Sequence, residues 1–195
     1  MAVPAPAQEV PAGLSRLEPI SVAGKTITLS ELEHWAGLAR RSSGMPRSRV
    51  HLHQAAQVLI SQRWIQGEAQ AMGIEVTGRE VRREFRKQRA ASYPSRRAYL
   101  RWLRTSGQTQ ADILLRVRMD ILSERISNRA IGGAKDPEEQ QRRLDAFVRD
   151  YRARWMAVTL CTPRFATVPT LDCGNKVDPV GRDGSGPESP GRDKI

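Results

Sequence analysis

Residues 109–131 read TQADILLRVRMDILSERISNRAI, and their apolar residues fall on two neighbouring lines at helical spacing. The first line holds Leu114, Val117 and Ile121, and the second holds Leu115, Met119, Leu122 and Ile126. Two adjacent lines make a face wider than a helix on the protein surface requires, so we expect packing on more than one side. Thr109 followed by Asp112 predicts the N-terminal cap, and Gly132-Gly133 predicts the end. This segment is therefore expected to form a long central helix against which the other helices pack.

The sequence on either side predicts further helices and short strands. Thr28 with Glu31, and Thr77 with Glu80, have the spacing of capping boxes and predict two helix starts. Alternating residues and a turn within 19–28 predict a short extended segment or hairpin. The other expected elements are helices at about residues 28–43, 50–72, 77–91, 95–106 and 136–155, and a short strand within 156–160. The predicted fold is all-α, with about six helices packed around the long central one and one or two short strands near the N-terminal and C-terminal ends.

The composition limits the size of the protein and the chemistry of its partners. Its 195 residues allow one core of ordinary size, which we expect at 19–173, between a disordered Pro/Ala-rich arm at 1–18 and a disordered tail at 174–195. A net charge of +11 permits nucleic acid, an anionic membrane surface or acidic polypeptides as partners. No apolar run approaches the length of a membrane span, which is about 18 residues. Residues 1–14 lack the apolar segment of a secretory signal.

Patterns that carry catalysis or metal binding are weak in this chain. The three histidines are His34, His51 and His53, and residues two apart on a helix, such as the last two, point in different directions. Glu80 and Glu84 share a helix face with arginines, which favours ion pairing over acid–base catalysis. No nucleophile motif and no glycine-rich phosphate loop is present. We therefore expect no catalytic residue, no metal site and no cofactor.

A series of segments in a particular order resembles one family. The segments are GKTIT at 24–28, LSELEHW at 29–35, YLRWLRTSGQT at 99–109, DILLRVR at 112–118, DILS at 120–123, LDAFVRDYRARW at 144–155, and the pair Cys161 and Cys173. Over about residues 20–173 this order resembles the N-terminal chaperone module of SurA/PrsA-type extracytoplasmic foldases, most of all the actinobacterial members. In such foldases a parvulin-type prolyl isomerase domain usually lies between the central helix and the last helix. Here only Gly-Gly-Ala-Lys separates Ile131 from Asp136, which leaves no room for that domain.

The resemblance implies a location and a state for the cysteines. By themselves, Cys161 and Cys173 are compatible with free thiols in a cytosolic protein or with a disulfide in an exported one. The resemblance favours the disulfide, and with it a location outside the cytoplasm, at the outer face of the cytoplasmic membrane. The missing signal then indicates either a start codon placed downstream of the true one or a copy that is not exported, and the paired cysteines favour the first explanation.

The resemblance also implies a function, which is ATP-independent binding of unfolded or nascent exported polypeptides by the chaperone module, closed by the helix at 136–155. The apolar residues that exceed a single core line are the candidate client-binding residues, and each also suits a core position: Trp35, Trp64, Tyr99, Trp102 and Met119. We expect a cradle between the helix that starts at Val50 and the helix that starts at Ser95, lined by Trp64 and Trp102.

Two alternative functions remain open from the sequence. The first is peptidyl-prolyl isomerisation, as the family name suggests, although the isomerase domain has no room here. The second is binding of nucleic acid through the basic stretch at 79–104, which otherwise is the solvated face of two helices. No helix-turn-helix recognition helix stands out, so we expect nucleic acid to be the less favoured partner. A small-molecule substrate is not expected.

Overall fold

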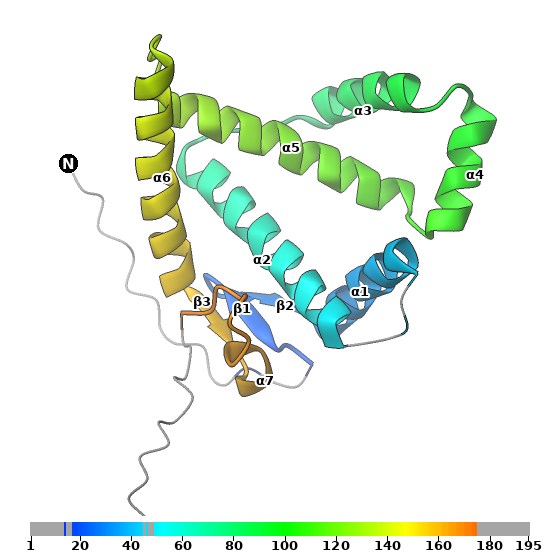
Figure 1. Ribbon diagram of the computed structural model, residues 1–195, viewed down its shortest axis with the longest axis horizontal. Helices are drawn as coiled ribbons and strands as arrows, with labels where there is room; N and C mark the ends of the chain where they lie inside the picture. Colours follow the sequence, from blue (N-terminus) through cyan, green and yellow to red (C-terminus); the bar gives the residue numbers. More distant parts are fainter. Residues whose placement is uncertain (1–13, 15–16, 45, 47–48, 175–195) are drawn as a thin grey trace, which may run out of the picture.

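Helices make up most of the computed structural model, which describes residues 14, 17–44, 46 and 49–174 (Figure 1). The helices are α1 Leu29–Ser43, α2 Arg49–Ala71, α3 Gly78–Ser92, α4 Arg96–Ser106, α5 Gln110–Ile131, α6 Pro137–Ala157 and α7 Pro163–Ala166. The strands are β1 Ile20–Val22, β2 Lys25–Ile27 and β3 Thr159–Cys161. The predicted all-α fold with short strands is confirmed. The disordered segments predicted for the two ends of the chain fall almost entirely outside the described residues.

Local side-chain hydrogen bonds determine where the helices begin. Each capping box joins a threonine hydroxyl, which accepts the backbone N–H three residues on, to a carboxylate that accepts the backbone N–H of the threonine. Complete boxes are formed by Thr28 with Glu31 in α1, Thr77 with Glu80 in α3 and Thr109 with Asp112 in α5. All three were predicted from the sequence. Helices α1, α4 and α5 end at glycines in the left-handed conformation, as expected for Gly44, Gly107 and Gly132.

The three strands form one antiparallel sheet with the order β2-β1-β3. Strand β1 pairs Ile20 with Ile27 of β2 on one side and with Cys161 of β3 on the other. The hairpin turn places Ala23 and Gly24 at positive φ, 49° and 76°, which suits the right-handed twist of the strands. The sheet therefore joins the start of the described chain to the segment that follows α6.

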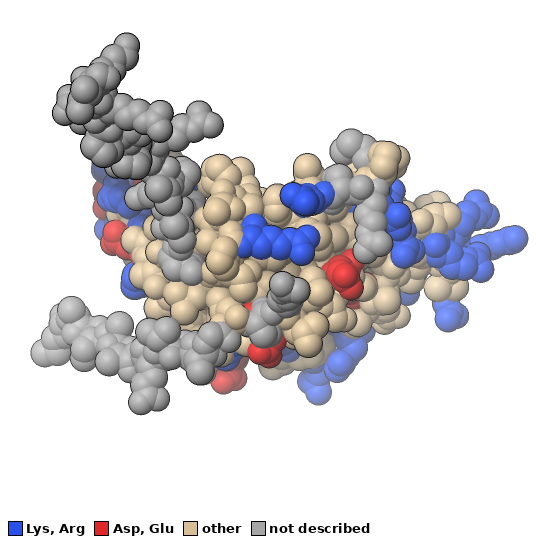
Figure 2. All heavy atoms as spheres, turned by 90° about the horizontal axis from the view of Figure 1, so that it is seen from below, with Lys and Arg blue, Asp and Glu red and all other residues tan. Residues whose placement is uncertain are grey.

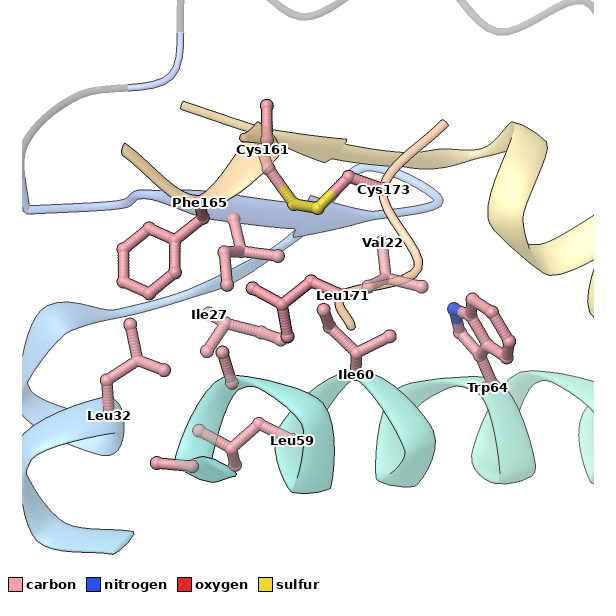
Figure 3. Packing of buried hydrophobic residues seen from close by; sticks show 14 of the residues in the cluster. Val22, Ile27, Leu32, Leu59, Ile60, Trp64, Cys161, Phe165, Leu171 and Cys173 are labelled. Carbon is pink, nitrogen blue, oxygen red and sulfur yellow. A yellow bond between two sulfur atoms is a disulfide. The ribbon is translucent and has the colours of Figure 1, made fainter. Parts of the chain in front are cut away.

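The core consists of two clusters of buried side chains. The first fills the space between the sheet, α1, the first part of α2 and residues 161–173 (Figure 3). The second lies between α3, α4, α5 and the end of α2. Helix α5 packs against α2, α3 and α6, as expected for the central helix, and α2 contributes to both clusters. Helix α6 lies across the ends of α2 and α5 (Figure 1), with Tyr151 and Trp155 on the first cluster and Phe147 on the second.

An ion pair between Glu80 and Arg125 attaches the start of α3 to α5. Hydrogen bonds from the Thr77 backbone N–H, from Arg125 and from the Thr77 hydroxyl lower the pKa of Glu80 from 4.5 to about 2. Because the pKa is lower in the folded state, Glu80 stabilises the fold above pH 4.5, and this contribution is lost as the pH falls towards 2.

We expect Glu80→Gln to destabilise the protein near neutral pH and to have progressively less effect as the pH falls through that window. Urea unfolding of the wild type and the variant at several pH values measures the difference. Glu84→Gln is the matched control, because Glu84 lies on the same helix but contacts Lys87 and Gln88 of α3 itself. A destabilisation by Glu80→Gln that does not change with pH would contradict the assignment.

Candidate functional site

A hollow between α1, α2 and α5 has a mostly apolar lining and a volume of about 290 Å³. Helices α2 and α5 diverge from the α6 end of the molecule towards α1 and α4 (Figure 1). Its lining comprises Trp35, Leu38, Ala39 and Ser42 of α1, Gln54, Ala55, Val58 and Gln62 of α2, and Gln108, Arg116 and Met119 from the start of α5 and the loop before it. We refer to it as the α1–α2–α5 hollow.

Two polar contacts fix the walls of the hollow relative to one another. Arg63 of α2 donates to Glu31 of α1 at 2.9 Å. His34 Nε2 of α1 lies 2.9 Å from Oδ1 of Asp112, the carboxylate of the α5 capping box. Burial of Asp112 opposes its ionisation, but hydrogen bonds from Thr109 and from His34 outweigh this effect and lower its pKa. The capping carboxylate thus also connects α5 to α1.

The lining of the hollow suits apolar side chains better than a charged or reactive ligand. Trp35 and Val58 supply most of the aromatic and aliphatic surface, because Leu38 and Met119 are only 7% and 6% exposed. The polar lining residues are glutamines, a serine and Arg116, whose guanidinium donates to Gln108. Among the described lining residues there is no carboxylate, histidine or cysteine. Binding by burial of apolar surface is therefore the chemistry that this site supports.

The structure separates the five predicted client-binding residues. Trp35 and Met119 both line the α1–α2–α5 hollow, but Met119 is only 6% exposed and packs in the second cluster. Trp64 is 5% exposed in the first cluster, where its indole N–H donates to the Thr159 hydroxyl at 2.8 Å. Tyr99 is 4% exposed in the second cluster and stacks on the half-buried Trp102.

The expected cradle between α2 and α4 is therefore wrong in its geometry. Trp64 and Trp102 belong to different clusters, because the face of α2 that carries Trp64 turns towards the sheet (Figure 3). Leu38, Ala39 and Gln62 also line the hollow and were not predicted to do so. In the sequence, Val58 lies beside the main apolar line of α2, which could have identified it, and in the structure it is 42% exposed.

The cysteines are bonded to each other and lie beneath the sheet. Cys161 of β3 and Cys173 are each 1% exposed, and they pack in the first cluster with Phe165 and Leu171 (Figure 3). The disulfide ties the segment after α7 back onto β3. The Gly174 backbone N–H, which donates to the Thr159 carbonyl at 2.7 Å, closes the same turn.

The histidines take part in packing. His51 is 3% exposed and its Nε2 lies 3.2 Å from the Ser43 hydroxyl. His53 meets the Phe165 ring edge-on, and burial together with Arg164 and Arg49 lowers its pKa. Within the described ranges, no three His, Cys, Asp or Glu side chains gather as metal ligands. None of the helices in this part of the chain is both long and apolar enough to cross a bilayer.

Comparisons of the chain with protein-family models, with curated proteins and with solved structures find no match.

Proposed function

We propose that this chain is an ATP-independent chaperone module that binds unfolded polypeptides outside the cytoplasm. The observation that carries the proposal is the α1–α2–α5 hollow, with its apolar walls and its polar rim of glutamines. A volume of about 290 Å³ suits an apolar side chain or two of an extended client rather than a folded surface. The order of segments that resembles extracytoplasmic foldases supports the same function.

The binding mechanism we propose is reversible burial of apolar client side chains against Trp35 and Val58, with Met119 at the floor of the hollow. Each side chain contributes roughly 25 cal/mol per Å² of apolar surface removed from water, so a few such contacts give weak binding that reverses as the client folds. No nucleotide is required for release. The short link between α5 and α6 favours binding over proline isomerisation, because residues 132–136 provide no catalytic domain.

The Cys161–Cys173 disulfide supports the location that we propose. Structural disulfides persist in oxidising compartments and are rare in a reducing cytosol. The proposed clients are therefore unfolded or nascent exported polypeptides.

A holdase assay tests the function. A denatured model protein is diluted with and without this chain, and its aggregation is followed by light scattering at low and at high salt. We expect suppression of scatter at both salt concentrations, because apolar burial is not screened by ions. Suppression at low salt alone, or at neither, would overturn the proposal.

A pair of surface variants tests the site. Val58→Asp places a charge in the hollow, and we expect it to weaken client holding about tenfold because the carboxylate opposes apolar burial. Val148→Asp on α6 is the matched control, since Val148 is 49% exposed and lies outside the hollow. We expect the control to hold clients like the wild type. Equal holding by the two variants would rule out the hollow as the client site.

A further inference from the structure

The positive charge of the protein is concentrated in the segment formed by α3 and α4, residues 78–106, which we call the basic hairpin. It contains ten of the Lys and Arg residues and only two acidic ones, so it carries +8 of the net charge of +11. Both acidic residues are already paired, Glu80 with Arg125 of α5 and Glu84 with Lys87. The exposed basic residues of the hairpin are Arg79, Arg82, Arg83, Arg86, Lys87, Arg96, Arg97, Arg101 and Arg104.

These charges lack internal partners and gather at one end of the molecule. Within the described residues, Lys87 is the only one of these nine that has a carboxylate within 4.0 Å. On the face that Figure 2 shows, Lys and Arg without acidic residues gather at the end where α4 lies, whereas basic and acidic residues are mixed at the opposite end. On α6, at that opposite end, Arg142 and Arg143 pair with Glu139. The contrast indicates a surface that attracts an anionic partner.

The outer face of α4 adds an apolar residue to this charge. Arg97, Leu100, Arg101 and Arg104 follow helical spacing on one face, and Leu100 is 43% exposed. The opposite face of α4 is occupied, because Tyr99 and Trp102 pack in the second cluster. An exposed leucine between arginines is typical of helices that lie in the interface of an anionic bilayer. On a nucleic acid backbone such a leucine would have no apolar environment.

We propose that the basic hairpin docks this protein on an anionic phospholipid membrane. The guanidinium groups of Arg97, Arg101 and Arg104 contact lipid phosphates, with which arginine forms paired hydrogen bonds. Leu100 enters the boundary between headgroups and acyl chains. The α1–α2–α5 hollow is lined by α1, α2 and the start of α5, so it is distinct from the basic hairpin. Membrane docking therefore does not depend on the proposed chaperone function.

Vesicle co-sedimentation of the full chain tests this proposal without any client. We expect binding to phosphatidylcholine vesicles that contain phosphatidylglycerol, loss of binding to pure phosphatidylcholine, and weaker binding as salt rises. The triple variant Arg97→Gln/Arg101→Gln/Arg104→Gln should lower the partition coefficient about 100-fold. The control is Arg129→Gln/Lys135→Gln/Arg149→Gln, which removes the same charge from exposed positions on α5, α6 and the loop between them. An equal loss in the control would show that net charge alone acts, and would overturn the docking surface.

The leucine distinguishes a membrane from other polyanions. We expect Leu100→Gln to lower vesicle binding about fivefold, because the apolar contact is lost, and Val148→Gln to leave it unchanged. A helical circular dichroism spectrum and melting temperature like those of the wild type verify that each variant is folded. Unchanged vesicle binding by Leu100→Gln would overturn the membrane docking of α4. Tighter binding to a short DNA duplex than to anionic vesicles would overturn the proposal in favour of nucleic acid.

Discussion

Replacing Gly67 with alanine is expected to destabilise the protein by about 3 kcal/mol, although alanine is the better helix former. A Cβ atom at Gly67 of α2 would lie 2.0 Å from Cη2 of Trp155 on α6. The rigid indole must therefore move, and its N–H loses the 2.7 Å hydrogen bond to Glu68. Glu68 is only 5% exposed, so an unsatisfied carboxylate oxygen adds to the cost of the steric overlap.

Gly37→Ala provides the matched control for this substitution. Gly37 also lies within a helix, α1, but a Cβ atom there meets nothing within 4 Å. This substitution should stabilise the protein by about 1 kcal/mol through helix propensity alone. Urea unfolding followed by circular dichroism measures both variants. A Gly67→Ala protein as stable as Gly37→Ala would mean that α6 does not pack on α2 as the structure places it.

Loss of the Cys161–Cys173 disulfide is expected to destabilise the protein by a similar amount, about 3 kcal/mol. The bond closes a loop with a sequence separation of 12, and the chain-entropy model assigns roughly this free energy to a loop of that size. For a chain of this length the loss corresponds to a fall in melting temperature of about 10 °C. Thermal unfolding of the Cys161→Ala/Cys173→Ala variant measures it.

Reduction of the wild-type protein should be slow in the native state. Both sulfurs belong to residues that are 1% exposed, so a reductant reaches them only when the turn around Gly174 opens. We expect mild denaturant to accelerate reduction strongly, as followed by thiol labelling and mass spectrometry. The reduced protein should then melt at the same temperature as the double alanine variant. Rapid reduction in native buffer would contradict the burial of the bond.

Local sequence signals predicted the helices well because their chemistry is confined to a few neighbouring residues. The threonine and carboxylate of each capping box are three residues apart, so Thr28, Thr77 and Thr109 identified three helix starts directly. The hairpin around Gly24 was found in the same way. The four-residue helix α7 was missed, since a single turn gives no periodicity to detect.

The candidate site was less predictable because it depends on how helices cross. The apolar pattern of α2 does not reveal that Trp64 turns towards the sheet while Val58 faces α1 and α5. Periodicity identifies an apolar face but not its partner, and two clusters share α2. Glu68 illustrates the same limit: it resembles a surface residue until Arg154 and Trp155, more than 80 residues later, bind both its carboxylate oxygens.

The central position of β1 in the sheet has a consequence for biosynthesis. Strand β1 is made early, yet its second edge stays open until residues 159–161 have been synthesised. During translation the hairpin therefore presents an unpaired edge, a type of surface that promotes association between chains. Oxidation of Cys161 and Cys173 can follow only after α6 has emerged. Residues 159–173, which complete the first cluster, are thus the last part of the described fold to be synthesised. We expect a chain truncated before residue 159 to aggregate rather than fold.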